Sequence, residues 1–120
     1  MDAVAGGPIV SDRYLAWLAG PLKQQIDRSY RTRRGPRDTA IAGSSMGGLM
    51  SLYAMGERPE VFGTAICFST HWPFGRELMV EGLINNLPEP GEHRVWTDAG
   101  TIDLDQHYAP FHQLAAQRLR

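Results

Sequence analysis

The stretch Thr39-Ala40-Ile41-Ala42-Gly43-Ser44-Ser45-Met46-Gly47 decides the fold class of this chain. Residues 39–43 form a short apolar run typical of a buried strand, and residues 47–55 carry the apolar side chains of a buried helix. Between them, residues 43–47 match the pattern Gly-x-Ser-x-Gly, in which a strand passes into a helix through a tight turn. We therefore expect the hydroxyl of Ser45 at the carboxyl edge of a parallel sheet.

This turn predicts a nucleophile at Ser45. The two glycines lack the Cβ atoms that would collide where strand and helix approach closely. The helix that follows directs N–H groups and a partial positive charge toward a developing oxyanion. Ser44 is not a candidate, because Ala42 and Met46 take the flanking positions of the pattern. The alternative is a glycine-rich turn that serves only packing or phosphate binding.

Downstream of the turn, predicted strands and helices alternate. Further strands are expected over residues 64–69 and 93–97, and helices over residues 78–87 and 104–119. Pro110 is tolerable in the last helix only near its first turn. This alternation predicts an α/β fold, with a parallel sheet of about three strands flanked by helices.

Upstream of the turn, the pattern predicts helix. Residues 1–10 are expected to form a loop, and Ser11 or Asp12 to cap a helix that follows. Gly20-Pro21 should kink or break that helix, and residues 32–38 should form a turn. The whole of residues 1–120 is expected to be one domain, in truncated form.

Composition narrows the class of partners. The content of 42% hydrophobic and 21% charged residues is typical of a folded protein and does not favour disorder. The net charge of −1 gives no reason to expect nucleic acid or an anionic membrane surface as a partner. No apolar run reaches the length of a membrane span, and we expect a cytoplasmic setting. The single cysteine, Cys67, excludes an intrachain disulfide and is expected to be a buried, inert thiol. Neither a metal nor a cofactor is expected.

Several blocks of the sequence resemble the Putative esterase family of α/β hydrolases, which is related to esterase D, enterochelin esterases and feruloyl esterases. The most specific blocks are Ile26-Asp27-Arg28-Ser29-Tyr30-Arg31-Thr32 and Ile41-Ala42-Gly43-Ser44-Ser45-Met46-Gly47-Gly48-Leu49, and looser similarity runs through residues 51–54, 59–63, 69–73 and 98–103. The resemblance implies a partial α/β-hydrolase fold. It also implies hydrolysis of a small carboxylic ester through an acyl-enzyme.

The resemblance implies roles for individual residues. Ser45 would be the nucleophile, the backbone N–H of Met46 an oxyanion donor, and Asp103 the acid that orients the base. Asp98 and Asp105 are the alternatives for the acid. The order Ser…Asp…His along the chain is that of α/β hydrolases.

The general base is not expected among the four histidines. His71 and His93 precede the acid, whereas His107 and His112 follow it too closely for the strand on which the family's histidine loop depends. We therefore expect a truncated hydrolase that lacks the front strands and the histidine, with impaired activity of its own, or a second chain that completes the fold.

His71-Trp72 follows the second strand at the edge where open α/β sheets bind ligands, so both are predicted to contact substrate. For Trp72, simple packing is an equal alternative. Two other functions stay open: acyl transfer by the same serine, and a non-catalytic remnant or partner subunit that keeps the turn for structural reasons.

Overall fold

The computed structural model describes residues 10–74 and 76–120. It divides into two compact units, Met1–Arg33 and Arg34–Arg120, and each is described by itself. The loop predicted for residues 1–10 lies outside the described residues except for Val10. The prediction of a single truncated domain stays a prediction.

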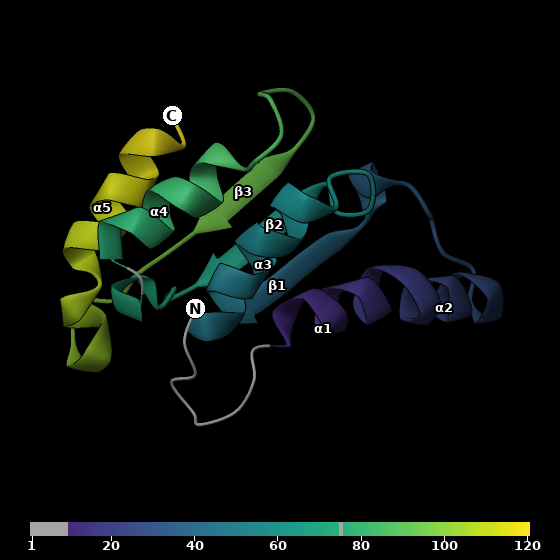
Figure 1. Cartoon of the computed structure of the whole chain (residues 1–120), viewed down its shortest axis with the longest axis horizontal. Helices are drawn as coiled ribbons and strands as arrows, with labels where there is room; N and C mark the ends of the chain where they lie inside the picture. The colour runs from purple at the N-terminus through teal and green to yellow at the C-terminus, as the bar shows by residue number, and fades with distance from the viewer. Residues whose placement is uncertain (1–9, 75) are drawn as a thin grey trace. The chain divides into compact units, whose positions relative to one another are not determined.

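The first unit is helical. Its described residues, 10–33, contain α1 (Ser11–Trp17), the π-helical segment η1 (Leu18–Leu22) and α2 (Lys23–Ser29) (Figure 1). Pro21 lies inside η1, so the predicted interruption takes the form of a wider π turn and the chain does not break. The predicted cap is wrong, because Val10 occupies the N-cap position and Ser11 is already the first helical residue.

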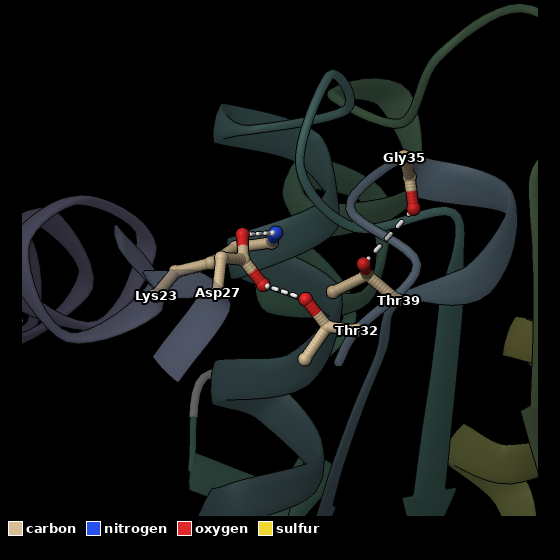
Figure 2. Close-up of polar contacts among 5 residues, drawn as sticks. All are labelled: Lys23, Asp27, Thr32, Gly35 and Thr39. Atoms are coloured by element: carbon tan, nitrogen blue, oxygen red, sulfur yellow. Dashed lines mark hydrogen bonds and ion pairs between the residues drawn. The ribbon is translucent and has the colours of Figure 1, made fainter. Parts of the chain in front are cut away.

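The carboxylate of Asp27 links the end of α2 to the residues that follow it. Asp27 accepts a hydrogen bond from Lys23 Nζ at 2.6 Å and another from Thr32 Oγ1 at 2.7 Å (Figure 2). Its two oxygens therefore join the last helical turn to the residues that leave it. In the second unit, Thr39 Oγ1 donates to the carbonyl of Gly35 at 2.9 Å and closes the turn that leads into the first strand (Figure 2).

The second unit is an α/β layer. Its strands are β1 (Ala40–Ser44), β2 (Thr64–Phe68) and β3 (Arg94–Thr97), which form a parallel sheet in the order β1-β2-β3 (Figure 1). The helices are α3 (Met46–Glu57), α4 (Arg76–Asn85) and α5 (Ala109–Arg118). Within residues 34–74 and 76–120 there are also three short 3-10 segments: η2 (Pro36–Asp38), η3 (Trp72–Phe74) and η4 (Asp103–His107). This confirms the predicted α/β class and the three-stranded parallel sheet.

One face of the sheet forms the core. Ala65 and Cys67 of β2 are fully buried on this face, and α3 packs against β1 and β2 and against α4, which in turn packs against α5. The predicted burial of Cys67 is confirmed, and this burial raises the pKa of its thiol to about 12. On the opposite face Phe68 and Trp96 are exposed and their rings contact each other, with centroids 5.3 Å apart and planes tilted by 60°.

Two predictions about helices can be compared with the structure. Pro110 lies in the first turn of α5, where its missing N–H breaks no helical hydrogen bond. Among the described helices, none has both the length and the apolar character that crossing a membrane requires.

Candidate active site

Ser45 lies at the junction of β1 and α3 with a strained backbone. Its φ is 59° and its ψ −116°, a conformation that residues other than glycine rarely adopt. Ser45 N donates to the carbonyl of Phe68 at 2.9 Å, and Gly48 N donates to the carbonyl of Ser45 at 3.0 Å. The hydroxyl of Ser45 makes no capping bond to α3. Main-chain hydrogen bonds therefore fix the backbone of Ser45, whereas its side chain makes no hydrogen bond that caps α3.

The two glycines of the pattern have different roles in this structure. A Cβ atom on Gly43 would lie 2.3 Å from the carbonyl oxygen of Gly47, so no side chain fits there. A Cβ atom on Gly47 would meet no described atom within 4 Å. The expected collision is thus confirmed at Gly43 and wrong at Gly47.

The predicted oxyanion donor lies at the start of α3. Met46 is the first residue of this helix, and the first N–H groups of a helix have no intrahelical acceptor. The helix dipole adds partial positive charge at the same point. The role of the Met46 N–H as an oxyanion donor stays a prediction.

The loop after β2 lies directly against Ser45. His71 N donates to the carbonyl of Ser45 at 3.1 Å, and a Cβ atom on Gly48 would lie 2.4 Å from Thr70 Oγ1. His71 is thus brought to the nucleophile turn, as its predicted contact with substrate requires. Trp72 is only 1% exposed, so a ligand at the surface does not reach its ring in this structure.

The three candidate acids have distinct surroundings. Asp98 Oδ1 accepts from Ser69 N at 2.8 Å. Asp105 Oδ2 accepts from Ser69 Oγ at 2.6 Å and from Gly100 N at 2.7 Å, and these two hydrogen bonds lower the pKa of the Asp105 carboxyl. Asp103 is exposed and has a φ of 53°, and its side chain makes no hydrogen bond to any described residue.

None of the histidines is hydrogen-bonded to the hydroxyl of Ser45 within the described part of the chain. His71 Nδ1 lies 2.7 Å from Tyr108 Oη, and His93 Nε2 lies 2.7 Å from the carbonyl of Pro59. His107 ends η4 and His112 lies in α5. Residues 10–74 and 76–120 also contain no cluster of three metal-ligating side chains.

Three residues near the site had not been singled out in the sequence. Ser69 and Gly100 donate to the acidic side chains, and Tyr108 lies against His71. Ser69 directly follows β2, as Ser45 directly follows β1, and both have positive φ. The position of Ser69 directly after a predicted parallel strand is therefore the one sequence feature that could have indicated it as a site residue.

The sequence profile of a family described as Putative esterase matches residues 3–115, which is nearly the whole chain. This chain belongs to the Putative esterase family. A search of curated proteins gave no match. The match confirms the family resemblance and places the chain among esterase-like hydrolases.

Among solved structures, the chain is similar to the enterobactin esterase FES from Shigella flexneri, crystallised in the presence of 2,3-Di-hydroxy-N-benzoyl-glycine. The TM-score is 0.63 and the identity 24%, and the match covers 88% of this chain but 31% of that one. The chain thus spans about a third of its structural relative. At this identity the likeness supports the fold alone, and it agrees with a partial α/β-hydrolase fold in this member of the Putative esterase family.

Proposed function

We propose that this chain carries the nucleophile and the acid of a serine hydrolase that acts on carboxylic esters through an acyl-enzyme on Ser45. The observation that carries the proposal is the positive φ of Ser45 at the junction of a parallel strand and a helix. Backbone strain of this kind is concentrated at functional sites. Membership in the Putative esterase family supports the same reaction class.

The proposed reaction has two halves. Ser45 Oγ attacks the carbonyl carbon of the ester while a base takes the hydroxyl proton, and the N–H of Met46 stabilises the resulting oxyanion. The C–O bond to the alcohol then breaks, and the alcohol leaves with that proton. Water repeats the attack on the acyl-serine, which releases the carboxylic acid and regenerates Ser45.

The base in this proposal is a histidine outside the four of this sequence, so the chain alone is expected to be weakly active. Asp103 is the acid by family resemblance. Asp105 is the alternative that the hydrogen bonds favour, because donors fix one carboxylate oxygen and hold the group ionised, as orienting an imidazolium requires.

External imidazole can stand in for the base in a direct test. The hydrolysis of p-nitrophenyl acetate by the chain, above a protein-free blank, should rise with imidazole, and Ser45→Ala should abolish that rise. Ser44→Ala is the matched control and should retain it. No difference between Ser45→Ala and the unsubstituted chain would refute the nucleophile and leave the non-catalytic remnant as the account.

The same assay separates the remaining alternatives. An added alcohol that captures the acyl group in preference to water would indicate acyl transfer. Asp103→Asn and Asp105→Asn should differ in the imidazole-dependent rate, and the variant with the greater loss identifies the acid.

A further inference from the structure

The hydrogen-bond ladder between β1 and β2 is irregular opposite Ser45. Continued by one residue beyond the strands, the register of β1 and β2 places Ser69 opposite Ser45. Ser45 N donates to the carbonyl of Phe68 at 2.9 Å, as in a regular parallel ladder. The carbonyl of Ser45 would then accept from the N–H of Thr70, but it accepts from His71 N at 3.1 Å. Two residues, Ser69 and Thr70, therefore face one, and this arrangement is a β-bulge, which we call the 69–70 bulge.

Ser69 forms the bulge with an unusual backbone conformation. Its φ is 42°, in the region that residues with a side chain rarely adopt and that glycine adopts freely. In one class of β-bulge the first residue has a positive φ and is a glycine. A serine at this position is disfavoured on its own, so other groups must hold it there.

Two carboxylates from the loop after β3 hold Ser69. Ser69 N donates to Asp98 Oδ1 at 2.8 Å, and Ser69 Oγ donates to Asp105 Oδ2 at 2.6 Å. Asp98 is itself fixed directly after β3, because its N donates to the carbonyl of Cys67 at 3.2 Å. Hydrogen bonds to an ionised carboxylate are stronger than those between neutral groups. The loop after β3 therefore offsets the conformational cost of the bulge.

The bulge in turn holds Ser45. The N–H and the C=O of Ser45 bond the residues on either side of the bulge, and Ser45 itself has a φ of 59°. The bulge is also packed against the first turn of α3, because Thr70 is 1% exposed and its Oγ1 takes the space that a Cβ on Gly48 would need. A strained backbone persists only where its surroundings over-determine it. The strain at Ser45 thus depends on the bulge.

We propose that Asp98 and Ser69 are positioning residues, which act through the 69–70 bulge to keep the backbone of Ser45 in its strained conformation. Asp98 holds the N–H of Ser69, and Ser69 acts on Ser45 through the main chain of the bulge. The proposal rests on the proposed function in one respect, that the strained Ser45 is the nucleophile. It gives Asp98 a role other than that of the acid that orients the base.

Amide hydrogen exchange tests the hold on Ser45 without any reaction. Asp98→Ala removes the acceptor of the Ser69 N–H, whereas Asp98→Asn is the matched control, because its side chain keeps an oxygen that can accept. In Asp98→Ala, the protection of the Ser45 and His71 amides should fall roughly tenfold more than that of the amides in α4, the effect of about one hydrogen bond. Asp98→Asn should keep most of this protection.

Three results of the exchange experiment would overturn the proposal. An equal fall at all amides of Asp98→Ala would show that Asp98 stabilises the whole chain and does not position Ser45. Unchanged protection of the Ser45 and His71 amides would show that the bulge does not need the carboxylate. A loss in Asp98→Asn as large as in Asp98→Ala would exclude the hydrogen bond as the cause.

A second pair of variants tests the backbone of Ser69 apart from its hydroxyl. Ser69→Gly and Ser69→Ala both lose the hydrogen bond to Asp105, but glycine favours a positive φ and alanine does not. With added imidazole, a fluorophosphonate probe should therefore label Ser45 about tenfold faster in Ser69→Gly than in Ser69→Ala. Equal rates in the two folded chains, or faster labelling of Ser69→Ala, would overturn the role of the bulge.

The two readouts distinguish this proposal from the proposed function. Exchange does not require Ser45 to react, so the expected exchange pattern without labelling in any variant would refute the proposed function and leave the positioning role supported. Labelling of Ser45 in the unsubstituted chain, together with an exchange pattern that contradicts the expectation, would refute the positioning role alone.

Discussion

At Gly43 the missing side chain is a steric requirement, because the main chain of Gly47 occupies the space a Cβ would need. Gly43→Ala should therefore force β1 and α3 apart and lower the free energy of unfolding by about 2–4 kcal/mol. Gly47→Ala is the matched control. It meets open space inside a helix and should be neutral or raise stability by up to about 1 kcal/mol.

Urea denaturation of the two variants measures this difference. The midpoint should fall for Gly43→Ala and stay or rise for Gly47→Ala, with the m-value unchanged. Equal losses for both variants would mean that the two glycines are required for the same reason, although the close approach at Gly43 is absent at Gly47.

The hydrogen bonds from Ser69 and Gly100 make the Asp105 carboxylate a source of pH-dependent stability. Because they lower its pKa in the folded state, the ionised form stabilises the fold above the ordinary aspartate pKa of about 3.9, and this contribution is lost as the pH falls through the lower, folded value. Asp105→Asn should therefore reduce the difference in unfolding free energy between neutral and acidic pH.

The matched control is Asp103→Asn, which removes a carboxylate without a hydrogen-bond partner among the described residues. Denaturation midpoints between about pH 2 and pH 7 should show a smaller acid-induced fall for Asp105→Asn than for Asp103→Asn. Identical pH profiles for the two variants would argue against the Ser69–Asp105 bond. A Ser69→Ala chain should have an Asp105 pKa closer to the ordinary value, as carboxyl NMR can measure.

A feature of the site could be predicted where its residues are close together in the sequence. The turn at Ser45 was predictable, because strand, turn and helix are encoded in adjacent residues. The bond between Ser69 and Asp105 joins residues 36 positions apart, and it forms only because two parallel strands end at the same edge. No sequence period indicates such a pair.

At the scale of elements, the faces of the sheet are unequal. α3 contributes Leu52, which is fully buried, to the covered face, whereas Phe68 at the end of β2 is 42% exposed on the other face. Leu52→Ala should cost about 2–5 kcal/mol of unfolding free energy through the cavity it leaves. Phe68→Thr exchanges one strand-forming residue for another and should cost less than about 1 kcal/mol.

Thermal or urea unfolding of these two variants checks which face is the core. A loss for Phe68→Thr as large as that for Leu52→Ala would show that the face carrying Phe68 and Trp96 is covered in solution. Parallel sheets are normally covered on both faces, so this outcome would point to a further segment or chain on it.

The elements themselves were predicted to different degrees. All three strands and α3 to α5 occur close to their expected ranges, because apolar runs of strand or helix length lie between clear proline and glycine breaks. The π turn at Leu18–Leu22 was not predicted, because a proline is compatible with either a helix break or a π turn and the sequence does not distinguish the two.

For the whole molecule, family membership and the fold agree with each other. The family profile spans residues 3–115, and the likeness to the enterobactin esterase FES covers 88% of the chain. The match covers 31% of the chain of that structure, and the identities of the base and of the ester stay proposals. The claim that can be tested in these residues is that Ser45 is a nucleophile.

Reaction with a fluorophosphonate probe, followed by mass spectrometry of the peptides, tests that claim most directly. We expect one adduct, on Ser45, which forms faster with added imidazole, is absent in Ser45→Ala and is retained in Ser44→Ala. An adduct on another residue, or equal labelling of the unsubstituted chain and Ser45→Ala, would contradict it.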